Sequence, residues 1–197
     1  QLMQRLYAMG KSVIITGGHY NNWELFAVTI NQQIPHDAAA LYTHLSNPFL
    51  DKKFLQTRSK YGLQMVPKEM VKQYFEEPKI KPFAMIFGSD QSPASHSKNY
   101  YRMRFLNQET AVLFGSEKYA KAYNCPVVYM RILKLKRGYY VFESELVEAD
   151  PATAPYGSIT EKHTRLLERD IIRAPQYWIW THRRWKIKLP PLHAEKS

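Results

Sequence analysis

The chain of 197 residues is poor in cysteine and has no long apolar run. Its single thiol, Cys125, excludes an internal disulfide framework and a cysteine-based zinc cluster. Because Cys125 precedes an apolar run at 126–128, we expect it to be buried and structural. No stretch approaches the roughly 20 apolar residues that cross a bilayer, and no secretory signal peptide is visible. Gln1 opens what reads as the tail of a helix, so we expect that an N-terminal part, with or without a membrane anchor, is missing.

Glycine patterns typical of nucleotide binding are absent too. Gly115 precedes an expected helix and offers backbone amides to an anion, but no P-loop ending follows it, and the dinucleotide fingerprint is missing. The stretch 96–104 interleaves basic and aromatic residues, as single-stranded nucleic-acid binders do. It lacks the glycine-framed pattern of an RNA-recognition motif. We therefore expect no nucleic acid as a partner and keep a basic nucleic-acid-binding module as an alternative.

The composition indicates one folded domain with an anionic partner. The chain is 45% hydrophobic and 14% aromatic, which argues against disorder over most of its length. The formal net charge of +11 favours nucleic acid, an anionic membrane surface, or a phosphorylated or acidic ligand. We expect a single domain over residues 1–189 and a flexible tail over 190–197, where two prolines exclude a continuing helix.

Apolar periodicity predicts an α/β fold with a mixed, mostly parallel sheet flanked by helices, because strand patterns alternate with helical ones. The strands are expected at Ser12–Thr16, Ala38–Tyr42, Leu63–Val66, Pro82–Phe87, Thr110–Phe114, Val127–Leu133 and Tyr139–Leu146. The helices are expected at Asn22–Gln32, Phe49–Tyr61, Lys68–Tyr74, Glu117–Tyr123 and Ser158–Ala174. Gly138 lies between two strand patterns and predicts one antiparallel hairpin late in the sheet.

The most informative motif is the segment 18–24, Gly-His-Tyr-Asn-Asn-Trp-Glu, at a predicted strand-to-helix turn. His19 and Glu24 provide the two functional groups needed to remove a proton from a hydroxyl, with imidazole as the base and the carboxylate orienting it. A structural alternative stands beside this interpretation. Asn21 and Glu24 also fit a variant of the capping box, with Asn21 as the N-cap.

Three further side chains are candidates for the same site. Arg58, on a predicted basic helix, would bind a phosphate or stabilise negative charge if it lay near the His–carboxylate pair. On composition alone it reads as a surface residue. Asp90 and Gln91 follow a strongly apolar strand, and α/β folds place ligand sites beyond the carboxyl ends of parallel strands. Gly-Ser-Asp is also ordinary turn chemistry, which leaves both interpretations open.

The C-terminal stretch combines tryptophan with a basic cluster. Trp178, Trp180, Arg183 and Arg184 suit a membrane interface, where indole rings lie at headgroup depth and cations meet phosphate. Equally, both tryptophans would cover the core while the arginines form ordinary salt bridges. The sequence does not separate these two interpretations.

Taken in chain order, these motifs resemble the lipid A biosynthesis acyltransferases, the lauroyl/myristoyl transferase family of Gram-negative bacteria. The resemblance covers nearly the whole chain, and its most specific segments are the first and the last. The matching positions are His19 and Glu24, Asn47-Pro48 with Arg58 and Gly62, Asp90-Gln91, Gly115, Pro126 to Val128, and Pro175 to Trp185.

The resemblance implies a glycerol-phosphate-acyltransferase-like fold; that related family carries Asp where this chain has Glu24. It implies transfer of a fatty acyl chain from acyl carrier protein to a hydroxyl of a phosphorylated glycolipid, a lipid A precursor, at the cytoplasmic face of the inner membrane. His19 would be the base, Glu24 would hold the imidazole, and Arg58 or backbone amides would stabilise the oxyanion. Neither a metal nor a cofactor is implied. The substrate-binding residues would be Asn22, Asn47, Asp90, Gln91, Gly115, Arg183 and Arg184.

Two other outcomes remain open from the sequence. In the first, the acceptor is a different membrane lipid: an aminolipid, a glycolipid or a lysophospholipid. In the second, the chain folds but is inactive without the N-terminal part expected to precede it.

Overall fold

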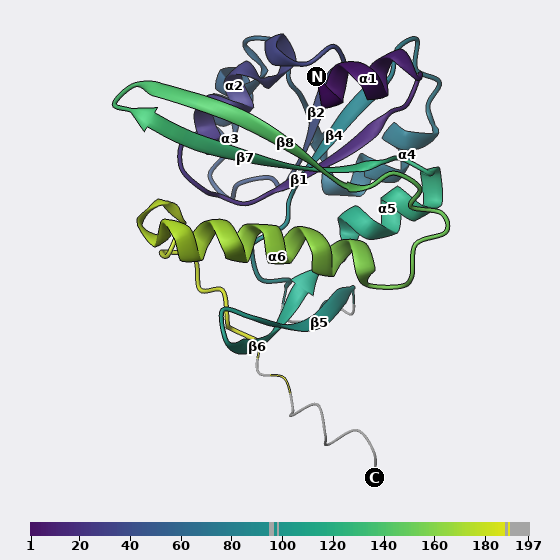
Figure 1. Ribbon diagram of the computed structural model, residues 1–197. Helices are drawn as coiled ribbons and strands as arrows, with labels where there is room; N and C mark the ends of the chain where they lie inside the picture. The colour runs from purple at the N-terminus through teal and green to yellow at the C-terminus, as the bar shows by residue number, and fades with distance from the viewer. Residues whose placement is uncertain (95–96, 98, 188, 190–197) are drawn as a thin grey trace.

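The computed structural model describes residues 1–94, 97, 99–187 and 189, and its centre is a six-stranded sheet (Figure 1). The strand order is β3-β2-β4-β1-β7-β8. Neighbouring strands are parallel except β8, which is antiparallel to β7. The strands span Val13–Gly17 (β1), Asp37–Tyr42 (β2), Gln64–Pro67 (β3), Phe83–Gly88 (β4), Val127–Lys136 (β7) and Tyr139–Glu148 (β8). The predicted α/β fold with a mostly parallel sheet is therefore confirmed.

Helices cover both faces of this sheet. Helices α1 and α2 pack on one face, whereas α4, α5 and α6 pack on the other (Figure 1). The helices are α1 (Leu2–Ala8), α2 (Trp23–Gln33), α3 (Pro48–Ser59), α4 (Val71–Glu76), α5 (Gly115–Tyr123) and α6 (Ser158–Arg173), with single 3-10 turns η1 (Lys68–Met70) and η2 (Pro175–Tyr177). Across the described residues, no helix has both the length and the apolar character that a membrane crossing requires.

The central strand β1 explains why the core forms here. Val13 and Ile15 pack toward α1 and α2, and Ile14 packs toward α5 and α6. All three are fully buried. A parallel strand covered on both faces needs apolar residues at successive positions, which is why this segment is a continuous β-branched run in the sequence.

The antiparallel hairpin predicted from Gly138 is confirmed. Gly138 adopts a φ of 81°, and β7 and β8 pair on either side of it. A left-handed residue at a tight turn favours glycine because a Cβ atom is sterically costly there.

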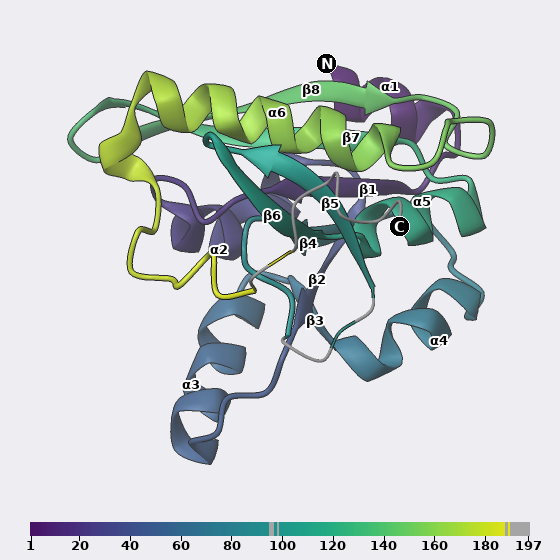
Figure 2. The same ribbon diagram turned by 90° about the horizontal axis from the view of Figure 1, so that it is seen from below.

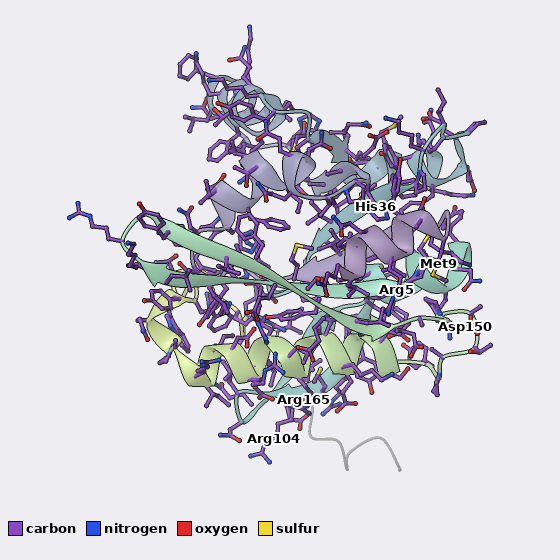
Figure 3. The ribbon with its side chains drawn as sticks, turned by 45° about the horizontal axis from the view of Figure 1, so that its top comes forward. Arg5, Met9, His36, Arg104, Asp150 and Arg165 are labelled. Atoms are coloured by element: carbon purple, nitrogen blue, oxygen red, sulfur yellow. The ribbon has the colours of Figure 1, made fainter. Side chains whose placement is uncertain are left out.

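A second, two-stranded sheet was only partly predicted. Strands β5 (Tyr100–Phe105) and β6 (Gln108–Leu113) form a separate antiparallel hairpin beside α6. The second half of the basic and aromatic stretch at 96–104 lies in β5, in which Met103 and Phe105 are buried. Arg104 is exposed on the same side of the molecule as Arg165 of α6 (Figure 3). His96 and Lys98 of that stretch, and the predicted tail at 190–197, lie outside the described residues.

Candidate active site

The site lies at the carboxyl edge of the sheet, where β1 and β4 run side by side. Gly17 and Gly88 are partners in this parallel register, and His19 and Asp90 each follow two residues later. The intervening chain passes close to other atoms, since a Cβ on Gly18 would lie 2.8 Å from a methyl of Leu167. Adjacent parallel strands therefore deliver an imidazole and a carboxylate to the same place.

His19 and Asp90 form a direct pair. The Nδ1 atom of His19 lies 2.8 Å from Oδ1 of Asp90, and the backbone N–H of His19 donates to Oδ2 at 2.9 Å. The imidazole is 28% exposed, whereas the carboxylate is 1% exposed. In the neutral ring, an Nδ1–H facing the carboxylate leaves the Nε2 lone pair to accept a proton. The arrangement is thus a buried orienting acid behind a reachable base.

The electrostatics of the pair follow from this geometry. Burial disfavours the imidazolium, but the hydrogen bond and the charge of Asp90 outweigh it and raise the pKa of His19 above its ordinary 6.5. Burial acts to raise the pKa of Asp90, yet the hydrogen bond from His19, with help from Trp178, lowers it overall. Asp90 is therefore ionised at neutral pH and stabilises positive charge on the ring.

Trp178 completes the surroundings of Asp90. Its indole Nε1–H donates to Oδ2 at 2.9 Å, and its side chain is buried. The backbone around it pairs with the turn that carries His19: Asn21 N donates to Tyr177 O at 2.8 Å, and Ile179 N donates to His19 O at 3.2 Å. Of the two interpretations of the tryptophans, burial applies to Trp178, whereas Trp180 is exposed.

The expected contact between Glu24 and the imidazole is corrected by the structure. Asp90 holds Nδ1, while Glu24, in the first turn of α2, accepts from Arg58 and from the indole N–H of Trp23 at 3.2 Å. Glu24 acts on His19 only through its charge, which raises the imidazole pKa, and the charge of Arg58 lowers it. Arg58 does lie near the histidine, as the catalytic interpretation required, although its direct partner is Glu24.

The capping alternative at this turn is also wrong in detail. The N-cap of α2 is Asn22, whose side chain accepts from Leu25 N at 3.1 Å. Asn21 instead adopts a φ of 57° and donates through Nδ2 to Ile132 O at 3.3 Å. Glu24, bound to Arg58, takes no part in a capping box.

Several predicted substrate-binding residues have structural partners. Asn22 caps α2, and Asn47 caps α3 by accepting from the N–H groups of Phe49 and Leu50. Gly115 begins α5, and Gln91 is half-buried beside Asp90. Among the described residues, no cluster of three or more His, Cys, Asp and Glu side chains is arranged to hold a metal ion.

Arg184 lies in the interior, a position that neither interpretation of the basic cluster describes. Arg184 is buried, donates from Nη1 to Thr110 Oγ1 at 2.8 Å and lies 5.6 Å over the ring of Phe105. Burial lowers its pKa to about 10, against the opposing effect of the Asp90 charge. The side chain therefore joins the C-terminal segment to the β5–β6 hairpin, while its neighbour Arg183 is exposed.

Sequence reasoning missed Trp178 and His182 as partners of this edge. His182 Nε2 accepts from Ser92 N at 3.0 Å, two residues after Asp90. Only the crowding of tryptophan and histidine near the C-terminus hinted at this role, and the same crowding suited a membrane interface equally well.

A comparison with protein families gives a match over nearly the whole chain. The family model described as bacterial lipid A biosynthesis acyltransferase matches residues 2–187 of the chain, which includes every residue of the site described above. No curated protein matches the sequence.

Proposed function

The chain belongs to the bacterial lipid A biosynthesis acyltransferase family, and from this premise we propose that it transfers a fatty acyl group from acyl carrier protein to a hydroxyl of a lipid A precursor. Family membership makes it an acyltransferase. The donor, the acceptor and the roles of individual residues are the proposed part.

The observation that carries the proposal is the His19–Asp90 pair at the carboxyl edge of the sheet. A part-exposed imidazole oriented by a buried carboxylate is suited to taking a proton from an alcohol. His19 Nε2 accepts the proton of the acceptor hydroxyl while Asp90 stabilises the imidazolium that forms. Trp178 and the backbone N–H of His19 keep the second oxygen of Asp90 occupied, so that the carboxylate stays ionised.

After this proton transfer, the reaction needs no reactant beyond the acyl donor and the acceptor. The acceptor oxygen attacks the thioester carbonyl carbon, and a C–O bond forms as the carbonyl oxygen becomes an oxyanion. The oxyanion collapses and the C–S bond breaks. His19 Nε2–H then returns its proton to the departing thiolate, which restores the neutral imidazole and yields an ester and a free carrier thiol.

Arg58 supplies positive charge beside this chemistry. Its side chain is 25% exposed, and its charge already acts on His19. A cation there would stabilise the oxyanion or bind an acceptor phosphate. Glu24, proposed from the sequence to hold the imidazole, would instead fix the direction of Arg58 through their shared hydrogen bonds.

The charge of the chain suits the proposed partners. An excess of 11 positive charges favours an acidic carrier protein, a phosphorylated glycolipid and an anionic membrane surface. These partners fit an enzyme working at the cytoplasmic face of the bacterial inner membrane.

Mass spectrometry of the products tests the proposal. We expect the protein, incubated with acyl carrier proteins of mixed chain length and a tetra-acylated precursor, to increase the mass of the precursor by one acyl group. His19→Ala should reduce this rate by at least about 10²-fold, since general-base catalysis contributes about 10²–10⁴-fold. An unchanged rate in His19→Ala would exclude the base. Acylation of an aminolipid, another glycolipid or a lysophospholipid in its place would reassign the acceptor.

A further inference from the structure

Helix α3 is unlike the other α-helices that the structure describes, because none of its residues is buried. It follows β2 near the edge of the sheet and extends away from the rest of the molecule (Figure 2). Large apolar side chains are exposed on it and just beyond it: Phe49 is 67% exposed, Leu50 48%, Phe54 43% and Tyr61 42%.

These side chains are ordered along the helix. Leu50 and Phe54 are four residues apart and form one stripe on α3, and Tyr61 follows just beyond the end of the helix. Lys53 and Lys60 are seven residues apart, form an adjoining row and are exposed. Lys53 Nζ lies 5.8 Å from the Phe49 ring, and Lys60 Nζ lies 5.4 Å from the Tyr61 ring. Exposed aromatic and basic side chains therefore lie side by side on α3 and at its C-terminal end.

The stripe adjoins the proposed catalytic site. The guanidinium of Arg58 lies 5.1 Å from the Phe54 ring on one side and binds the Glu24 carboxylate on the other. Glu24 acts electrostatically on His19. The exposed apolar side chains of α3 are thus linked to His19 through one ion pair, formed by Arg58 and Glu24.

The geometry points to α3 as the element by which the protein lies on an anionic bilayer, with Phe49, Leu50 and Phe54 in the acyl boundary and Lys53 and Lys60 at headgroup phosphates. This inference rests on the proposed function, since a lipid acceptor requires the active site to meet a membrane. Apolar residues beside lysines are the composition of helices that lie in the interface plane.

A bilayer fits this helix better than an acidic protein does. A protein partner needs a groove to receive a projecting helix, whereas lipid surrounds a protruding element from several sides. The exposed apolar groups occur on more than one side of α3, from Phe49 to the Leu50–Phe54 stripe. Positive charge beside them adds attraction to anionic lipid, worth about 1 kcal/mol for each lysine near the surface.

Vesicle co-sedimentation of the whole chain tests the assignment. The probes are vesicles of phosphatidylcholine with 30% phosphatidylglycerol, and vesicles of phosphatidylcholine alone. We expect Phe49→Ser/Leu50→Ser to weaken binding to the anionic vesicles about tenfold or more, because both side chains lose apolar contact. Lys53→Gln/Lys60→Gln should weaken binding to the same vesicles about tenfold and leave binding to neutral vesicles unchanged.

Matched controls separate a specific surface from general effects. Ile80→Ser/Ile172→Ser removes two strongly exposed apolar side chains elsewhere, and Lys81→Gln/Lys118→Gln removes two exposed lysines outside α3. Both controls should bind as the unaltered chain does. If the α3 variants bind anionic vesicles no more weakly than these controls, the inference is wrong. If they lose binding only to acyl carrier protein, α3 is a protein-docking surface and the inference is equally wrong.

A second assay tests the proposed reaction separately from membrane binding. Acyl transfer to acceptor dissolved in detergent micelles should be unchanged in Phe49→Ser/Leu50→Ser, because neither residue belongs to the catalytic group. Failure of the unaltered chain to acylate any lipid in micelles would overturn the proposed function and leave the vesicle result standing.

Discussion

Arg58 of α3 donates two hydrogen bonds to the carboxylate of Glu24 on α2, with Nη2–Oε1 at 2.5 Å and Nε–Oε2 at 3.1 Å. Two parallel bonds between planar groups fix direction as well as distance. The pair joins the first turn of α2, five residues after His19, to the last turn of α3. The two charged side chains are therefore held together beside His19, the proposed base.

A double-mutant cycle on this pair is the first prediction. Glu24→Gln and Arg58→Gln should each lower kcat/KM by about tenfold or more, because the side chain that remains loses the partner that orients it. The double variant should be little worse than the more damaging single variant. Steady-state kinetics with one acyl donor measures all four chains. Fully additive losses would mean that the two residues act independently.

The pH profile of transfer should reveal the influence of Asp90 on the base. His19 must be neutral to accept a proton, and its pKa is raised by Asp90, so kcat/KM should fall as pH decreases through a value above 6.5. Asp90→Asn removes the raising charge, and the inflection should move to lower pH while the rate at pH 8 falls by about 10²-fold or more. An inflection that stays in place would show that another group titrates.

Trp178 is expected to position the acid without touching substrate. Trp178→Phe keeps the buried ring and removes the only side-chain donor described on Oδ2 of Asp90. We expect kcat to fall about tenfold with KM nearly unchanged, together with a shift in the acid limb of the pH profile. Trp180→Phe, at an exposed indole on the same segment, is the control. A merely structural role would lower thermal stability and leave the pH profile where it is.

Acid should destabilise the fold through His163. This imidazole is fully buried in α6 beside Ser116, and burial lowers its pKa from 6.5 to about 4. The unfolded chain therefore binds the proton more tightly than the folded chain, and stability is lost as pH falls from 6.5 toward 4. A shift of this size corresponds to about 3 kcal/mol.

Urea unfolding at pH 7 and pH 4.5 measures this effect. The difference in unfolding free energy between the two pH values should be smaller in His163→Gln than in the unaltered chain. An equal pH dependence in the two chains would contradict the assignment to His163.

The sequence located the parts of the site but not all of their pairings. His19 and Asp90 were both identified, because each follows an apolar strand and adjacent parallel strands end at one edge. Glu24 seemed the better acid since it is five residues from His19, whereas Asp90 is 71 residues away. Their contact depends on the Gly17–Gly88 register, which no local pattern encodes.

Two further differences have the same physical origin. β5 was missed because arginines alternate with Met103 and Phe105 on a strand covered on one face, and the basic residues dominated the pattern. The burial of Arg184 was not predicted because guanidinium groups rarely lie inside unless partnered, and its partner, Thr110, is 74 residues earlier. In both places tertiary packing decided what composition left open.

The groups gathered around Asp90 come from three distant parts of the chain: the turn after β1, the turn after β4, and the segment at Trp178, which pairs with the first of them through the Tyr20–Trp178 bridge. During synthesis, His19 leaves the ribosome long before Trp178, whose indole donates a hydrogen bond to Asp90. Because domains generally fold as units, the proposed proton-transfer groups come together only after the segment around Trp178 has been synthesised.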